Sequence, residues 1–176
     1  MPLGVMRRLL VAAWSIAGTV LITGLAGCAY SFTGASVPAH LKTIAIPLVD
    51  DQSGFGEPGL RELFTTQLTN LFINDNSLEV ADRSHADSIL EGIVTSVSDA
   101  PAMIQQGEQV SKRRITVNAR FMFQDMKLRK KVWEKTFSNW GEYQSSGGGA
   151  SQRQAGLQEA IRKLTEDILL ETVSGW

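Results

Sequence analysis

The clearest candidate binding site in this 176-residue chain is formed by nine basic side chains between positions 112 and 135. Only Asp125 and Glu134 oppose them, so this window carries a net charge of +7 although the whole chain carries −1. Arginine offers a planar fork and lysine a point charge to phosphate oxygens. The densest part, Lys127-Leu128-Arg129-Lys130-Lys131, is called the basic tip below. We predict that phosphates are bound first by the cations of the basic tip and second by the arginines before it: Lys127, Arg129, Lys130, Lys131, Arg113, Arg114 and Arg120.

The same cations have a plainer interpretation. Proteins commonly place lysines on exposed strands to prevent edge-to-edge aggregation, and such a turn needs no ligand. The two interpretations differ in salt dependence, because exposed charges are screened beyond about 8 Å at physiological ionic strength. Phosphate binding by the basic tip would therefore weaken as salt rises.

A different chemistry is expected at Cys28, the only cysteine in the chain. It follows Leu25-Ala26-Gly27, and ahead of these lie Arg7, Arg8 and an uncharged, largely apolar run over residues 9–27. This order resembles the lipobox of bacterial lipoproteins, in which the thiol receives a diacylglycerol and the signal is cut just before it. We predict a removed signal peptide over 1–27, a lipidated tether over 28–40 and a single periplasmic α+β domain over 41–176. A permanent membrane span, which usually needs about 20 apolar residues, is the alternative.

The lipid decides where the chain is expected to work. A single acyl chain holds weakly, whereas several on one cysteine give an effectively permanent anchor. Ala29 follows the cysteine where aspartate would, by resemblance to enterobacterial sorting rules, indicate retention in the inner membrane. We therefore predict a lipid-anchored protein of the outer membrane that faces the periplasm. Its expected partners are outer-membrane lipid and lipopolysaccharide, the abundant phosphorylated molecule there, and not nucleic acid.

A glycine motif invites a nucleotide-binding interpretation. Gly54-Phe55-Gly56-Glu57-Pro58-Gly59 matches the dinucleotide fingerprint between a strand and a helix. However, Asp50 and Asp51 lengthen the turn and would repel a pyrophosphate, and repeated βαβ units are missing. We interpret the motif as a loop that needs residues with positive φ before a helix.

Catalytic and metal-binding patterns are weak. His40 and His85 lack the spacing of metal ligands, and Ser53 lacks a nucleophile elbow. The sequence predicts no enzyme, no metal site and no cofactor other than the covalent lipid on Cys28.

The elements that must position the basic tip follow from hydrophobic periodicity. Alternation with period two predicts strands over 43–49 and 113–124. Further strands are expected over 78–81, 88–98 and 131–142, with a tight turn over 126–130. Helical spacing predicts one helix over 57–74 and a second that begins at Ser151. We expect an α+β fold with a single mixed or antiparallel sheet of four or five strands and two helices packed on one face.

Single residues refine these elements. Pro47 cannot donate to a ladder, which places the first strand at an edge or a bulge. Pro58 suits a first helical turn, and Asn74-Asp75-Asn76 is expected to end that helix. Gly92 predicts a bulge or a close neighbour in its strand.

Several segments together resemble the LptE-related lipopolysaccharide-assembly lipoproteins. They are Cys28-Ala29-Tyr30-Ser31-Phe32 with Gly34, Leu41-Lys42-Thr43-Ile44-Ala45-Ile46-Pro47, Glu57-Pro58-Gly59-Leu60 and Ala86-Asp87-Ser88-Ile89-Leu90-Glu91-Gly92. The resemblance implies an α+β sandwich that plugs the LptD β-barrel, assists its assembly and binds lipopolysaccharide through basic residues during insertion into the outer leaflet.

A second resemblance stays open. The strand, acidic glycine loop and helix, followed by Val80-Ala81-Asp82-Arg83, are similar to the amino-terminal fold of TolB and to the CsgG and LpoB lipoproteins. That likeness implies a secretion-pore component or an activator of peptidoglycan synthases.

Overall fold

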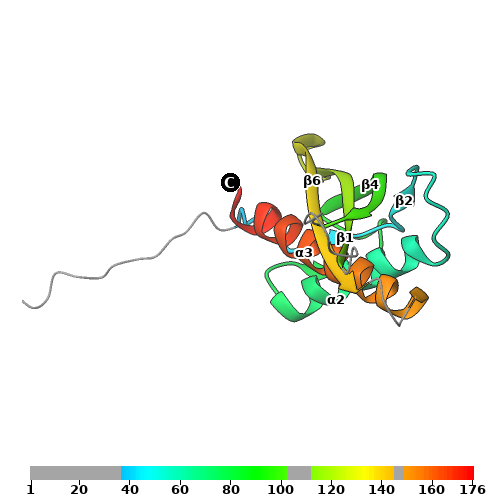
Figure 1. The fold of residues 1–176 in the computed structure, drawn as a ribbon. Coiled ribbons are helices and arrows are strands. Elements are labelled where there is room, and N and C mark those ends of the chain that lie inside the picture. The colour runs from blue at the N-terminus through cyan, green and yellow to red at the C-terminus, as the bar shows by residue number, and fades with distance from the viewer. Residues whose placement is uncertain (1–36, 103–111, 145–148) are drawn as a thin grey trace, which may run out of the picture. The chain divides into compact units, whose positions relative to one another are not determined.

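A six-stranded mixed sheet organises the fold, with strands in the order β3-β1-β4-β5-β6 and β2 paired to β4 (Figure 1). The structure, a computed structural model, describes residues 37–102, 112–144 and 149–176, all within the compact unit Ala35–Trp176. The elements are β1 (Thr43–Ala45), β2 (Asp50–Asp51), α2 (Leu60–Asp75), β3 (Glu79–Val80), β4 (Ser88–Pro101), β5 (Lys112–Asp125), β6 (Lys130–Gln144) and α3 (Gly149–Ser174). The predicted α+β class is confirmed.

Three long strands, β4 to β6, form an antiparallel meander that dominates the sheet. The alternation predicted for β5 is confirmed, because its apolar side chains on one face are all fully buried: Ile115, Val117, Ala119, Phe121 and Phe123. Residues of β5 on the other face, among them Arg120 and Gln124, are exposed or half-buried. The sheet thus has one core face and one open face.

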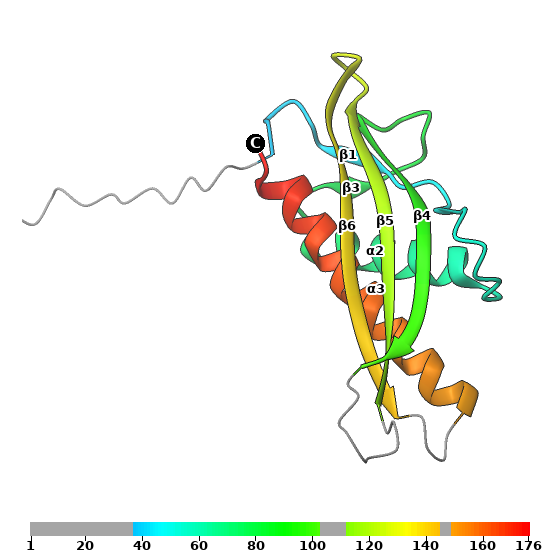
Figure 2. The ribbon, with the colours of Figure 1, turned by 45° about the horizontal axis from the view of Figure 1, so that its top comes forward.

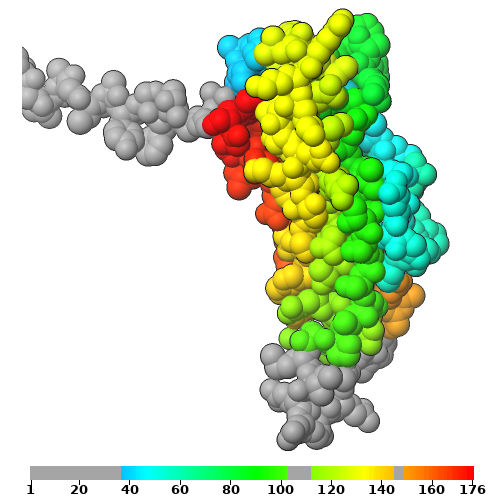
Figure 3. All heavy atoms as spheres, turned by 90° about the horizontal axis from the view of Figure 1, so that it is seen from above, coloured from blue at the N-terminus to red at the C-terminus, as the bar shows by residue number. Residues whose placement is uncertain are grey.

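Both helices lie on the core face. Figure 2 shows α2 and α3 behind the long strands, and Figure 3 shows β4, β5 and β6 side by side with no helix over their open face. The predicted stripe of α3 is confirmed, since Leu157, Ala160, Ile161, Leu164 and Ile168 are buried. Helix α3 begins at Gly149, two residues before the predicted start.

Helix α3 touches β6 at two glycines. A Cβ atom on Gly141 would lie 2.0 Å from the carbonyl oxygen of Gly156, which no side chain tolerates. The missing side chains therefore let the helix backbone approach the sheet directly. This contact fixes where α3 crosses β6.

The glycine motif is a loop before α2, as predicted. Gly54, Gly56 and Gly59 have φ of 67°, 71° and 76°, the left-handed region that glycine adopts without strain. Helix α2 begins at Leu60, so Pro58 precedes the helix instead of lying in its first turn. The helix ends as expected, with Asn76 at φ 58° and its N–H bonded to the Phe72 carbonyl.

The first strand differs from its prediction. The expected strand over 43–49 is only β1, which lies between β3 and β4 and is not an edge, and Pro47 lies beyond its end. The chain then returns to β4 as β2, which raises the strand count to six. Gly92 has the predicted close neighbour, because a Cβ there would lie 2.2 Å from Phe121 Cε1, whereas the bulge falls between Val94 and Ser96.

Candidate functional site

The basic tip lies on the turn between β5 and β6, at one end of the long strands (Figure 2). The buried Asp125 ends β5, and its Oδ1 accepts a hydrogen bond from the Leu128 N–H at 2.8 Å. Arg129 adopts φ of 52°, a left-handed conformation that is uncommon for a residue with a side chain. The turn is therefore fixed by a buried carboxylate beneath it.

A second carboxylate joins the turn to the beginning of the described chain. Asp87 accepts hydrogen bonds from the backbone N–H groups of Lys42 at 2.8 Å and Thr43 at 3.3 Å, and it pairs with Lys127 Nζ at 2.8 Å. Lys127 also donates to the His40 carbonyl at 2.7 Å. His40 Nε2 in turn lies 2.5 Å from Asp125 Oδ2. We call these four side chains, His40, Asp87, Asp125 and Lys127, the joint.

The joint holds its carboxylates ionised. The hydrogen bond from Lys127 lowers the pKa of Asp87, although partial burial opposes this. Burial would raise the pKa of Asp125, but hydrogen bonds from His40 and from the Leu128 N–H together hold it below its ordinary value. Lys127 is thus committed to a structural ion pair.

The remaining cations of the basic tip differ in their pairing. Lys131 pairs with Glu134 at 2.8 Å and lowers the pKa of that carboxyl. Arg129 and Lys130 are exposed, and neither side chain forms an ion pair or hydrogen bond within the described part of the chain. These two adjacent cations are available to an outside anion.

Two of the second-rank arginines lie at the other end of β5, about 40 Å from the turn at roughly 3.3 Å per strand residue. Arg113 Nε bonds to Asp99 at 2.9 Å and to the Tyr143 hydroxyl at 3.0 Å. Arg114 pairs with Glu142 at 2.8 Å and lies 4.0 Å from the centre of the Trp140 ring. The structure therefore does not gather the seven predicted cations into one patch.

Arg120 occupies an intermediate position on the open face. It lines a shallow pocket of about 350 Å³ with Lys131, Glu134, Lys135 and Thr136. Lys135 pairs with Glu171 of α3 at 2.6 Å. Arg120 is exposed and lies near enough to Glu134 to lower the pKa of that group, after the larger effect of Lys131.

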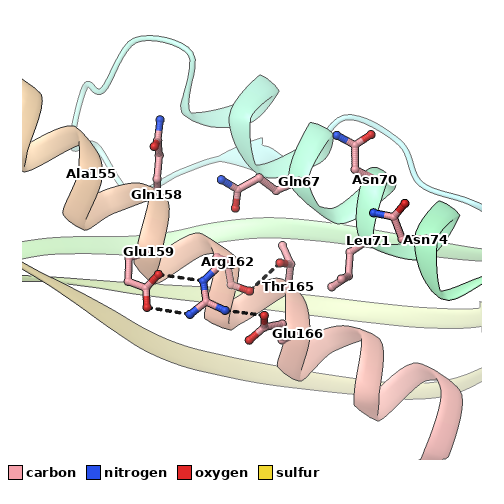
Figure 4. A pocket seen from close by; sticks show the side chains of 10 residues that line it. All are labelled: Gln67, Asn70, Leu71, Asn74, Ala155, Gln158, Glu159, Arg162, Thr165 and Glu166. Carbon is pink, nitrogen blue, oxygen red and sulfur yellow. Dashed lines mark hydrogen bonds and ion pairs between the residues drawn. The ribbon is translucent and has the colours of Figure 1, made fainter.

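A larger groove of about 480 Å³ lies between α2 and α3. Figure 4 shows amide side chains from both helices along it, among them Gln67 and Gln158. Its one cation, Arg162, is held by Glu159 at 2.8 Å and by Glu166, and the bond from Arg162 lowers the pKa of Glu159 to about 2. Because two carboxylates surround its single cation, the groove offers nothing that would select a phosphate.

Sequence reasoning missed the joint. His40 and Asp125 are 85 residues apart, and Asp87 and Lys127 are 40 residues apart, so no local pattern connects them. The apex residue Leu128 was also missed as a feature in its own right, although its place within a run of cations was visible. Cys28 lies outside the described residues, and its lipidation stays a prediction.

Two absences are found among the described residues, which do not include the predicted signal peptide over 1–27. None of their helices is both long and apolar enough to cross a membrane. The same residues contain no group of three or more histidine, cysteine, aspartate and glutamate side chains arranged to hold a metal ion.

Solved structures share this fold at low sequence identity. The PelC dodecamer from Paraburkholderia phytofirmans is 15% identical, with a TM-score of 0.51 over 81% of this chain and 94% of that one. The hypothetical protein CT253 from Chlamydia trachomatis is 9% identical, with a TM-score of 0.56 over 74% and 95%. A minor lipoprotein from Acinetobacter baumannii is 14% identical, with a TM-score of 0.50 over 77% and 92%. At these identities the likeness concerns the fold alone.

Family membership comes from the sequence. No match was found among curated proteins. The family model LptE, described as lipopolysaccharide-assembly, matches residues 41–172, which include every described helix and strand for most or all of its length. The chain therefore belongs to the LptE lipopolysaccharide-assembly family.

Proposed function

We propose that this chain is a non-enzymatic lipoprotein of the outer membrane, facing the periplasm, that partners an LptD-type β-barrel as plug and assembly factor. In this role it binds lipopolysaccharide during insertion into the outer leaflet. Family membership supports the assembly role. The lipobox-like segment ending at Cys28 supports the anchor.

One observation supports a phosphorylated ligand: Arg129 and Lys130 are adjacent, exposed and free of ion pairs within the described part of the chain. The other charges of the turn are compensated, since Lys127 faces Asp87 and Lys131 faces Glu134. An arginine fork beside a lysine point charge suits two neighbouring phosphate oxygens. Lipopolysaccharide supplies such phosphates at this membrane.

The proposed tether is consistent with this role. His40 lies twelve positions after Cys28, and a fully extended chain of that length reaches about 40 Å. Because His40 contacts the base of the turn, the basic tip would stay within that distance of a lipid on Cys28.

Charge reversal at the basic tip tests the ligand. The variants are Arg129→Glu with Lys130→Glu and, as a control, Lys112→Glu, which reverses an exposed cation at the far end of β5. We expect the double variant to bind lipopolysaccharide at least tenfold more weakly, with a flatter salt dependence, and the control to bind as wild type. Unchanged binding would reduce the chain to a structural adaptor of the barrel.

Co-purification in mild detergent tests the partner. The proposal expects a large β-barrel to accompany the chain. A penicillin-binding protein would instead indicate a peptidoglycan-synthase activator, and a homo-oligomeric ring would indicate a secretion pore.

A further inference from the structure

Leu128 is an apolar side chain placed at the apex of a cationic turn. Its exposed fraction is 65%, the largest among the exposed large hydrophobic residues of the described chain. Its neighbour Met126 is 37% exposed on the same turn. Lys127 and Arg129 flank Leu128 directly, so apolar and cationic groups share one small surface.

The turn presents Leu128 in a fixed position. The Leu128 N–H is bonded to the buried Asp125, and the Met126 N–H donates to the Asp87 carbonyl at 2.8 Å. Both aspartates belong to the joint, which is anchored to the strands and to residues 40–43. A preorganised backbone loses little further freedom when its side chain is buried by a ligand.

We propose that the basic tip binds the boundary between the phosphates and the acyl chains of an aggregated amphiphile. Leu128 enters the first carbons of the acyl layer while Arg129 and Lys130 remain at the phosphates. This inference rests on the proposed function and narrows its ligand class to phosphorylated lipid in a micelle or bilayer, as opposed to a soluble phosphorylated sugar.

The chemistry of an interface favours this arrangement. At the boundary of lipid and water, arginine and lysine keep their charged heads at the phosphates while their stems and neighbouring apolar groups lie in the acyl region. A soluble phosphate would gain from the two cations alone and would leave Leu128 in water. The groove between α2 and α3 differs, because its one cation, Arg162, is paired with Glu159 and Glu166 and is not available to a phosphate.

The position of the turn agrees with a lipid surface. The described chain begins at Val37, three residues before His40, which contacts both Asp125 and Lys127. The first described residues therefore lie at the same end of the strands as Leu128. The opposite end of the strands carries Arg113 and Arg114, both held in ion pairs.

Two exposed leucines provide a matched experiment. Leu128→Ser is compared with Leu170→Ser, because Leu170 is 63% exposed but lies in helix α3, outside the basic tip. Binding is measured to lipopolysaccharide micelles and to the same molecule after complete deacylation, which is soluble and keeps its phosphates. Leu128→Met serves as the conservative variant.

We expect Leu128→Ser to weaken binding to the micelles about tenfold and to leave binding to the deacylated form unchanged. Leu128→Met, which keeps an apolar side chain, should bind both probes as wild type does. Leu170→Ser should match wild type on both probes. If Leu128→Ser binds the micelles as wild type does, or loses both probes equally, Leu128 does not contact acyl chains and the inference fails. The proposed function fails separately, if reversal of Arg129 and Lys130 leaves both probes bound.

Discussion

Asp87 offers the most direct test of the joint, because one carboxylate fastens both the beginning of β1 and the turn that carries the basic tip. Its side chain is only 15% exposed, and it accepts two backbone N–H bonds, from Lys42 and Thr43, besides the ion pair with Lys127. Asp87→Ala removes all three interactions, whereas Lys127→Ala removes the ion pair and the exposed hydrogen bond to the His40 carbonyl.

The geometry predicts a clear order of effects. We assign about 1.5 kcal/mol to the 2.8 Å bond from Lys42, about 1 kcal/mol to the longer bond from Thr43 and about 0.5 kcal/mol to the half-exposed ion pair. Asp87→Ala should therefore lower the free energy of unfolding by about 3 kcal/mol. Lys127→Ala should lower it by about 1 kcal/mol, because the exposed bond to the His40 carbonyl is lost together with the ion pair. Asp87→Asn, which keeps an acceptor oxygen, should fall between them.

Urea denaturation of the purified protein measures these differences, provided that the dependence on urea concentration stays the same among variants. A double-mutant cycle between Asp87→Ala and Lys127→Ala should return a coupling of about 0.5 kcal/mol. Equal destabilisation by the two single substitutions would refute the reasoning, since the two backbone bonds to Asp87 would then contribute no more than the single bond from Lys127 to the His40 carbonyl.

Three further predictions concern the glycines and the acid response. Gly141→Ala should lower the free energy of unfolding by about 3 kcal/mol or more in urea titrations, because its Cβ would lie 2.0 Å from a backbone oxygen. Gly156→Ala should lower it by less than half of that, because its Cβ would meet the Tyr143 side chain at 3.2 Å. Gly59→Ala should cost about 1 kcal/mol by the same assay although the space around it is open, since its φ is 76°, and Gly59→Asn should recover part of this loss. The folded-state pKa values of Asp87 and Asp125 are lowered, so the stability that their carboxylates contribute is complete above the ordinary carboxyl pKa of about 4. This contribution is lost as the pH falls through the lower folded-state pKa values. Between pH 6 and 2, the melting temperature should therefore fall less steeply for Asp87→Asn and Asp125→Asn than for wild type.

Periodic patterns predicted the large elements well. The five alternating apolar residues of β5 and the stripe of α3 are buried because each repeats with the period of its element. The end of α2 was also predictable from the sequence, since asparagine tolerates the left-handed conformation that Asn76 adopts. These features depend on neighbours in sequence, which a single chain displays directly.

Short and non-local features were not predictable in the same way. Strand β2 has two residues, and it exists because Asp50 and Asp51 lie beside Ile93 and Val94 of β4. The bulge near Ser96 likewise depends on the partner strand. A pattern of two residues is too short to predict either strand β2 or the bulge from the sequence.

The candidate site was predictable in composition but not in arrangement. The excess of positive charge over 112–135 identified the hairpin, yet charge alone could not separate a paired cation from an unpaired one. Lys127 is bound to Asp87, and Arg113 to Asp99, through contacts that only the folded chain creates. Arg129 and Lys130 are distinguished because no carboxylate reaches them within the described residues.

The joint also determines how the unit bears mechanical load. A pull on the chain ahead of Val37 reaches His40 and Lys42 before any other described element, so the first bonds to resist it are those to Asp125 and Asp87. Behind them, β1 runs parallel to both of its neighbours, and force along it shears the ladder as a whole in place of unzipping it bond by bond. Tension on the beginning of this unit would therefore act on the turn that carries the basic tip through the bonds to Asp125 and Asp87.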